Sequence, residues 1–305
     1  LQLLRINMIQ IFIHVFTFLS LLNSELFSQV TSEQLHYGAA SLSMANSDIA
    51  LPETSWSAFV NPAGMVNQKG LTLVASSQSH FSQSFINHSL FGVQFKNPKY
   101  GSLGISVENS SVNYSGNELV TETAIGLHQG IALRTDGISS FSIGYGIKSY
   151  SIEYGNSAGP SGDGSDGISL GALNTFGLDI SFLGSLGDRI RAGAKAFNIN
   201  SPSLGNANNA TRLPQRAQIG LAYSPYDLVW TTVALNKSVG HSTNFSSGFS
   251  YEISKRVVLR SGMQTSPNRF SSGFEFHFKN VNVSYGFITH PVMPSSHQIS
   301  FELNR

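Results

Sequence analysis

Charged residues are scarce in this sequence. Asp, Glu, Lys and Arg make up only 11% of the 305 residues, whereas a soluble domain averages about 25%. So little charge is hard to reconcile with a surface that faces water on all sides. The formal net charge is +1 and the 18 Lys and Arg residues are scattered. This argues against a nucleic-acid-binding protein, because phosphate contacts require clustered basic side chains.

Cysteine and long hydrophobic segments are also missing. The chain has no cysteine, which excludes a disulfide framework and a lipoprotein anchor. After the N-terminal region, no segment approaches the roughly 20 apolar residues of a membrane-spanning helix. Two architectures remain: a large soluble β-sandwich rich in Ser, Asn and Gly, and a β-barrel that exposes one face of each strand to lipid.

The N-terminal region has the order of a secretory signal peptide. An apolar stretch from about Ile9 to Leu22 follows Arg5, and a polar stretch ends at Ser28. The apolar stretch is too short for a stop-transfer helix. We expect residues 1–28 to be a signal peptide that directs the mature chain out of the cytoplasm. The alternative is a buried or interfacial helix.

From residue 70 onward, apolar and polar residues alternate with a period of two, which indicates β-strands. Phe270, Phe274 and Phe276, for example, alternate with Gly273 and Glu275. The polar face of most segments carries Ser, Gly, Asn and Thr rather than the abundant Lys and Glu of a soluble exterior. We therefore predict an all-β fold in which residues 70–305 form an antiparallel transmembrane β-barrel of about 14 strands, located in the outer membrane of a Gram-negative bacterium.

The connections between the predicted strands fall into two classes. Residues 135–137 and 279–280 form tight turns, whereas 109–118, 155–167 and 199–213 are long and polar. Short turns at one rim and long loops at the other are typical of outer-membrane barrels. Closing the sheet also removes edge strands, which would otherwise promote aggregation.

Motifs that suggest an enzyme are weak in their context. Residues 162–167 match GxGxxG but lie in a loop rich in Pro, Gly and Ser that opens no helix. Residues 167–171 match GxSxG but begin an alternating strand rather than a strand-to-helix turn. His290 and His297 flank a Pro-rich turn without a third metal ligand close in sequence, so we expect both to hydrogen-bond the backbone of a hairpin. The sequence predicts neither an enzyme nor a cofactor or metal site.

Residues 29–69 do not alternate, and they precede the first predicted strand. Pro52 is a helix-start signal, and an Asn-Pro turn follows a short apolar segment. A 14-strand barrel is too wide to be filled by its own side chains. We therefore predict that residues 29–69 fold into the lumen as a hatch or plug, the alternative being a disordered leader. The predicted hatch motif consists of Trp56, Phe59, Asn61, Pro62, Ala63, Gly64 and Met65.

The segment GAASLSMANSDIALPETSWSAFVNPAG (38–64) resembles the N-terminal signature of the PorV/PorQ and FadL-like outer-membrane proteins. The segments LPQRAQIGLAYSP (213–225) and VSYGFITHPVMPSSHQISFEL (283–303) resemble later strands of the same proteins. The resemblance covers nearly the whole mature chain and implies a 14-strand barrel with an N-terminal hatch. Its closing hairpin motif consists of Tyr285, His290, Pro291, His297 and Phe301.

Three functions remain open at this point. The resemblance runs closer to PorV-like chains, which favours a non-enzymatic accessory of type IX protein secretion or surface attachment, with a large secretion translocon or exported cargo proteins as partners. The second is a FadL-like passive conduit for hydrophobic small molecules. The third, a secreted soluble β-sandwich adhesin, would need a more charged exterior. Both barrel functions imply contact with outer-membrane lipid and none with nucleic acid.

The conduit hypothesis makes two structural predictions that the accessory hypothesis does not. It predicts an apolar pocket beside the turn at Asn61 and Pro62. It also predicts a lateral gap in the barrel wall where a strand kinks, and glycines within strands favour such kinks. The candidate positions for the kink are Gly144, Gly146, Gly171 and Gly177.

Overall fold

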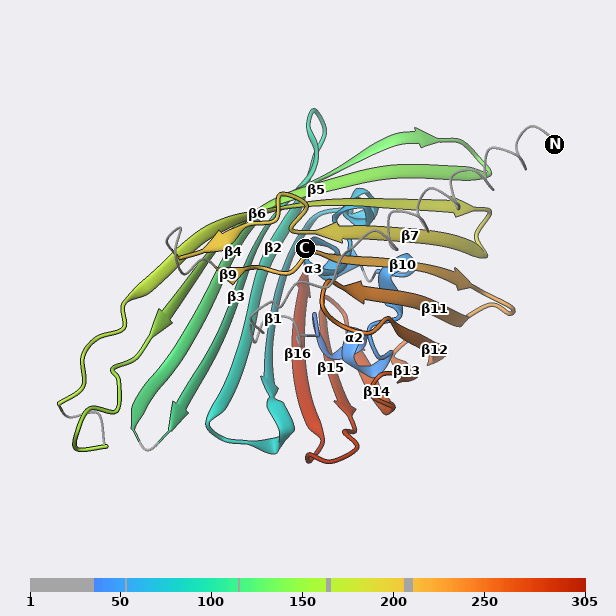
Figure 1. The fold of residues 1–305 in the computed structure, drawn as a ribbon. Coiled ribbons are helices and arrows are strands. Elements are labelled where there is room, and N and C mark those ends of the chain that lie inside the picture. The colour runs from blue at the N-terminus through green and yellow to red at the C-terminus, as the bar shows by residue number, and fades with distance from the viewer. Residues whose placement is uncertain (1–35, 53, 115, 163–165, 206–210) are drawn as a thin grey trace.

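The computed structural model describes residues 36–52, 54–114, 116–162, 166–205 and 211–305. Fourteen antiparallel strands form one closed barrel (Figure 1). The predicted barrel and its strand number are confirmed. The β-sandwich alternative is wrong, because the strands form a single closed sheet rather than two packed sheets. Within the described ranges, no helix is long and apolar enough to span a bilayer.

The alternation pattern predicts strands that start near Gly70, His88, Tyr100, Leu119, Ile138, Ile168, Arg189, Arg216, Leu228, Phe245, Arg256, Phe270, Val281 and Ser296. Each barrel strand begins within four residues of its predicted start, and the largest difference is at β6. Two short strands, β8 and β9, pair with each other outside the barrel sheet. The barrel strands are β1 (Leu71–Ser79), β2 (Ile86–Asn97), β3 (Gly101–Tyr114), β4 (Asn117–Thr135), β5 (Ser139–Tyr154), β6 (Ala172–Leu186), β7 (Ile190–Phe197), β10 (Arg216–Tyr223), β11 (Val229–Ser238), β12 (Asn244–Ser254), β13 (Val257–Gln264), β14 (Arg269–Phe278), β15 (Val281–Ile288) and β16 (Ser296–Asn304); the short pair is β8 (Ser203–Leu204) and β9 (Thr211–Arg212).

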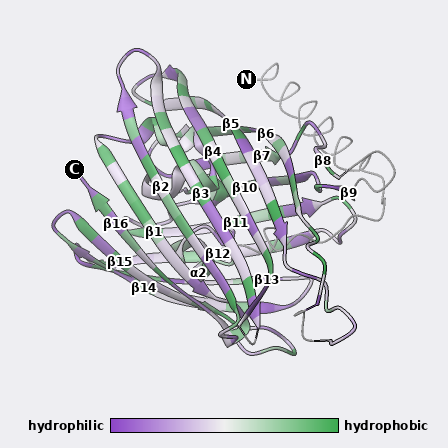
Figure 2. Cartoon of the chain, turned by 90° about the vertical axis from the view of Figure 1, so that its left-hand side faces the viewer, coloured by the Kyte–Doolittle hydropathy of each residue, from purple (hydrophilic) through white to green (hydrophobic). Residues whose placement is uncertain are grey.

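Each barrel strand has an apolar outer face and a more polar inner face. On β14, Phe270 and Phe278 are exposed on the outside of the barrel, whereas Gly273 and Glu275 are buried on the inside. Hydrophobic and hydrophilic positions alternate along the strands in Figure 2. The outer face is therefore suited to lipid, as the alternation in the sequence predicts.

The two rims of the barrel differ in the length of their connections. β1 begins and β16 ends at the same rim, which we call the terminal rim; all six turns that connect strands there have two to five residues. The longest connections, 155–171 and 198–215, lie at the opposite rim, which we call the loop rim. In outer-membrane barrels the short turns face the periplasm and the long loops face outward, so the loop rim is the extracellular one.

One predicted loop is wrong. Residues 109–118 belong mostly to two strands, because β3 continues to Tyr114 and β4 begins at Asn117. Cross-strand pairing runs as far as Tyr114 and Asn117, with a register shift between Val112 and Asn113. The polar residues of this segment are compatible with strand here because β3 to β6 extend beyond the shorter strands on the opposite side of the barrel (Figure 1).

Residues 36–52 and 54–69, which we call the lumenal segment, lie inside the barrel (Figure 1). They form short helical turns rather than strands. The predicted signal peptide, residues 1–28, and the start of the predicted hatch, residues 29–35, lie outside the described residues. The helical turns are α2 (Ala39–Ser43), η2 (Asp48–Ala50), η3 (Thr54–Trp56), α3 (Ser57–Val60) and η4 (Pro62–Asn67), and η5 (His80–Ser82) follows β1 at the loop rim.

Candidate functional site

The lumenal segment follows the inner wall of the barrel through almost a full turn. α2 contacts β13 to β16, η2 contacts β7, β10 and β11, and η4 contacts β2 to β6. η3 contacts β1, and Ser47 lies against Gly248 of β12. The segment therefore touches all fourteen strands, and any movement of it changes the free cross-section of the lumen.

Glycines of the inner wall allow this close approach. A Cβ atom at Gly262 would lie 2.5 Å from the carbonyl carbon of Met44, and one at Gly130 would lie 2.5 Å from the carbonyl oxygen of Pro62. These distances exclude any side chain unless the backbone moves. Ten strands each place one glycine against the lumenal segment: Gly92, Gly104, Gly130, Gly144, Gly193, Gly220, Gly248, Gly262, Gly273 and Gly286.

These ten glycines, which we call the glycine belt, were not identified from the sequence as contacts of the predicted hatch. Of the four candidate kink positions, Gly144 belongs to the belt and Gly146 packs against the His128 ring. Both are paired on each side, with β4 and with β6. The predicted lateral gap is therefore wrong at these two positions, and their lack of a side chain serves close packing instead.

The turn at Asn61 anchors the lumenal segment. The Asn61 side chain donates to the carbonyl oxygens of Ile49, at 2.9 Å, and of Phe182 in β6, at 3.1 Å, and its Oδ1 accepts from the Ala63 amide at 3.1 Å. Pro62 occupies the first position of η4, where its missing N–H leaves no donor unpaired. Beyond Pro62, Gly64 packs against Pro52, since a Cβ there would lie 2.7 Å from the Pro52 ring.

The aromatic residues of the predicted hatch motif form its buried core. Trp56 and Phe59 are fully buried, with ring centroids 5.5 Å apart, and Tyr37 lies 5.8 Å from Phe59. Met65 is also buried and lies against Gly104. The structure thus brings all seven residues of the motif together in the lumen. The conduit hypothesis predicts an apolar pocket beside Asn61 and Pro62. The lumen contains two cavities, of about 290 and 370 Å³, and neither Asn61 nor Pro62 lines either of them.

Buried ion pairs line the inner wall next to the lumenal segment. Lys148 Nζ lies 2.6 Å from Glu108 Oε1, and both side chains are at most 5% exposed. Lys195 pairs with Asp179 at 3.5 Å and donates to the Phe59 carbonyl oxygen at 2.8 Å. Period-two alternation places these residues on the inner face, but their pairing depends on strand register, so the ion pairs were not predictable from the sequence.

The residues of the closing hairpin motif lie on two different surfaces. Tyr285 and His297 face outward, and the Tyr285 hydroxyl and His297 Nδ1 are 2.7 Å apart. Phe301 is 52% exposed on the same outer face. His290 lies with Pro291 in the connection after β15, and its Nδ1 accepts from the amides of Val292 and Met293.

The predicted hydrogen bonding to a hairpin backbone is thus confirmed for His290 and wrong for His297. The reason is that His297 follows the turn on β16, where its ring points away from the connection and toward Tyr285. Across the ranges that the structure describes, no group of three or more His, Asp or Glu side chains could hold a metal ion.

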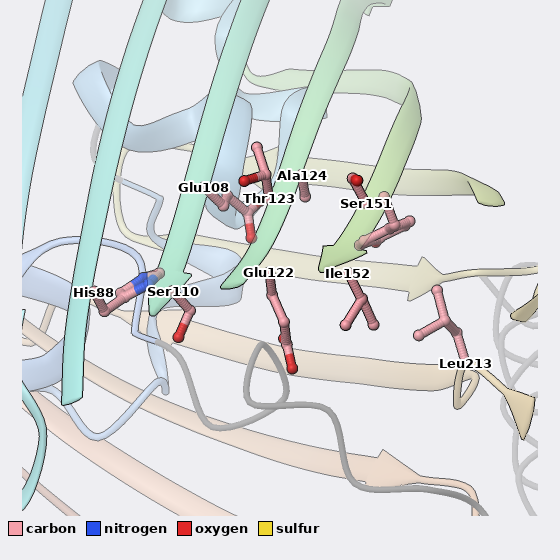
Figure 3. Close-up of a pocket in the computed structure, with 10 residues that line it drawn as sticks. His88, Glu108, Ser110, Glu122, Thr123, Ala124, Ser151, Ile152 and Leu213 are labelled. Carbon is pink, nitrogen blue, oxygen red and sulfur yellow. The ribbon is translucent and has the colours of Figure 1, made fainter. Parts of the chain in front are cut away.

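The loop-rim end of the long strands carries an apolar cluster on its inner face. Ile152 of β5 is buried together with Leu204 and Leu213, which come from the connection 198–215; the partly buried residues around them are Val120, Tyr150 and Leu173. A small crevice of about 10 Å³ opens beside this cluster, and Figure 3 shows Glu122, Ile152 and Leu213 around it. We use the name mouth cluster for Val120, Tyr150, Ile152, Leu173, Leu204 and Leu213.

The barrel wall next to the mouth cluster is only partly a β-ladder. β7 pairs with β6 over Ile180–Leu186, whereas β6 begins at Ala172. Over part of the remaining length, loop residues replace the ladder: Asn200 accepts from the Leu178 amide and donates to the Phe176 carbonyl, each at 2.9 Å. Gly177, one of the four candidate kink positions, lies in this stretch, and Gly171 precedes it with a φ of 77°.

Comparison with solved structures identifies outer-membrane channels with this fold. The Pseudomonas putida toluene transporter TodX superposes with a TM-score of 0.59 at 12% sequence identity, over 88% of this chain and 99% of that one. The CymD monoaromatic hydrocarbon channel superposes with a TM-score of 0.58 at 12% sequence identity, over 88% of this chain and 98% of that one. A Pseudomonas aeruginosa FadL homologue superposes with a TM-score of 0.57 at 10% sequence identity, also over 88% of this chain and 98% of that one. No protein-family model and no curated protein matches the sequence. The chain is an outer-membrane β-barrel with the fold of the FadL-type channels.

Proposed function

We propose that this barrel is a passive channel for small hydrophobic molecules. The mouth cluster carries the proposal: its apolar side chains lie on the inner face of the barrel at the extracellular end. Two solved proteins of the same fold are described as a monoaromatic hydrocarbon channel and a toluene transporter. The sequence resemblance to FadL-like proteins agrees with this assignment.

The position of the mouth cluster suggests how a solute enters. Leu204 and Leu213 cover Ile152 and Leu173 from the loop side, so a hydrophobic molecule binds there by displacing two leucines from an apolar surface. The neighbouring wall is closed by hydrogen bonds of the loop residues Ile199 and Asn200 rather than by a complete ladder. A solute held by the mouth cluster is therefore next to the weakest part of the wall, through which it can reach the lipid.

Uptake of radiolabelled toluene by cells that express the barrel tests this proposal. We expect faster uptake than in cells with an empty vector, and a return to the vector rate for Leu213→Asp, which puts a charge into the mouth cluster. Val292→Asp is the matched control, because Val292 is 87% exposed at the tip of another connection at the same rim. Equal uptake with and without the barrel, or equal loss in both variants, would overturn the proposal.

The second candidate is an accessory role in type IX secretion or surface attachment, which the PorV/PorQ resemblance favours. Its supporting observation is the set of apolar side chains exposed on loop-rim connections, including Ile168, Val292 and Met293, since exposed apolar patches mark interaction sites. Affinity purification of the tagged barrel from native outer membranes distinguishes the two roles. Stoichiometric recovery of a secretion translocon or of cargo proteins supports the accessory role, and recovery of the barrel alone supports the channel.

A further inference from the structure

Two cavities lie on opposite sides of the lumenal segment, along β10 to β14. The outer cavity, of about 290 Å³, is lined by residues of the loop rim such as Ser238, Ser242 and Pro267. The inner cavity, of about 370 Å³, is lined by residues near the terminal rim such as Leu228 and Asn282. Each cavity is large enough for several water molecules, and each extends from the lumenal segment toward its own rim.

A single short piece of chain separates the cavities. Ser41, Asn46 and Asp48 line the outer cavity, whereas Ala40, Met44 and Asp48 line the inner one. Asp48 thus borders both cavities, and neighbouring residues of the same turn face opposite sides. We call residues 40–48 the partition. Among the residues that the structure describes, the partition lies between the two cavities.

The partition is fixed to the wall by its backbone. Gln218 of β10 donates to the Asn46 carbonyl at 2.7 Å, and Ser271 of β14 donates to the Ser43 carbonyl at 2.8 Å. The Ser300 hydroxyl of β16 accepts from the Ala39 amide at 2.8 Å. None of these bonds uses the side chains of Met44 or Asp48. Shortening those two side chains therefore removes material between the cavities and leaves the anchors in place.

The two cavities carry opposite charge. Arg216, Lys237 and Arg269 line the outer cavity, and Asp48 is its only acidic residue among the described residues. Glu252, Glu275 and Glu302 join Asp48 around the inner cavity, together with Arg191 and Arg260. The outer cavity therefore attracts anions and the inner cavity attracts cations.

We propose that the two cavities are halves of a polar route through the barrel, for water and small ions, which the partition closes. This route is separate from the apolar one at the mouth cluster, which lies on the β4–β6 side. It depends on the partition alone, so it can hold whether or not the barrel carries hydrophobic molecules. A shift of the partition away from the wall would join the cavities.

Ion conductance in planar lipid bilayers with potassium chloride tests the route. We expect the wild-type barrel to pass little current and Met44→Ala/Asp48→Ala to pass severalfold more. Met65→Ala is the matched control: Met65 is a buried methionine of the lumenal segment that lines neither cavity, so its truncation should leave the current at the wild-type level. A double variant that conducts no better than Met65→Ala overturns the proposal.

Thiol labelling provides a second test that requires no increase in current. Because the chain has no cysteine, a single introduced thiol reports its own exposure. In the folded, detergent-solubilised barrel, we expect Asp48→Cys to react with a small charged methanethiosulfonate much faster than Met65→Cys. Equal protection of the two thiols would overturn the proposal, even if the double variant fails to fold. Toluene uptake is measured separately, so failure of the polar route and failure of the hydrophobic channel are distinguishable.

Discussion

The indole Nε1 of Trp56 donates a hydrogen bond of 2.7 Å to Glu302 Oε1, which joins the lumenal segment to the last strand of the barrel. Both residues are buried, and the other carboxylate oxygen of Glu302 accepts from Asn282 at 3.2 Å. Removal of a hydrogen-bond donor from a buried carboxylate destabilises the fold, because the desolvation of the carboxylate is no longer offset. This contact therefore fastens the lumenal segment near the terminal rim.

Trp56→Phe should lower the free energy of unfolding by about 1.5–3 kcal/mol, the usual contribution of a hydrogen bond to a charged group. Urea unfolding of the barrel in detergent measures the change. Trp230→Phe is the control, since Trp230 is the only other tryptophan and stacks against Arg191 near the terminal rim. If both variants unfold at the wild-type midpoint, the bond to Glu302 does not hold the segment.

The glycine belt predicts sensitivity to a single methyl group. Gly262→Ala places a Cβ 2.5–2.8 Å from backbone atoms of Met44, which cannot move aside as a flexible side chain could. Overpacking of this kind costs about 1–3 kcal/mol. Gly137→Ala should be neutral, because nothing lies within 4 Å of a Cβ at that turn position. The urea midpoints of the two variants give the comparison, and a loss at Gly137 equal to that at Gly262 would contradict the close-packing explanation.

The sequence predicted the barrel well because period-two alternation is a local property of each strand. Phe274 and Glu275 point to opposite faces wherever β14 lies, so the strand number and the lipid-facing side followed directly. Which inner residues meet depends on strand register, which no local pattern encodes in this chain. The pairing of Lys148 with Glu108 and the contact of Gly262 with Met44 were therefore not predictable, although the inward direction of each residue was.

The sequence singles out the residues of the predicted hatch motif, but it does not indicate which residues of the barrel wall they contact. Asn61 and Trp56 were chosen from the sequence because the segment breaks the alternation, and both lie buried in the lumen. The mouth cluster was missed because Leu204 and Leu213 lie in a long connection without periodicity. Their burial depends on how that connection folds back over β5, and this is a tertiary effect.

The buried pair of Lys148 and Glu108 predicts a non-additive effect. Lys148→Met leaves Glu108 buried without its partner and should lower the free energy of unfolding by about 3–5 kcal/mol. Lys148→Met/Glu108→Gln should recover most of this loss, because neither remaining group is charged. Arg134→Met, which breaks an exposed pair with Asp136, should leave the stability nearly unchanged, because solvent screens exposed ion pairs. Strictly additive single and double variants would show that the two charges do not interact.

Asp48 predicts a pH dependence of stability. Burial raises the pKa of its carboxyl group to about 6, although a hydrogen bond from Ser41 opposes the shift. The folded barrel therefore binds this proton more tightly than the unfolded chain, whose Asp has a pKa of 3.8. As the pH rises from 3.8 to 6, the free energy of unfolding should fall, in total by about 3 kcal/mol at 1.36 kcal/mol per unit.

Asp48→Asn removes the ionisation, so this fall should disappear and the variant should be more stable than the wild type at pH 8. Asp136→Asn is the control, for which the change in the free energy of unfolding should have the opposite sign. Backbone amides of Ser139 and Ile138 hold the pKa of Asp136 at about 2. The ionised carboxylate therefore stabilises the folded barrel, and this stabilisation is lost as the pH falls through about 2. Asp136→Asn should accordingly destabilise the barrel at pH 7. Urea midpoints measured from pH 2 to pH 8 check both signs. An Asp48→Asn profile that keeps the wild-type slope between pH 4 and pH 6 would show that folding does not raise the pKa of Asp48.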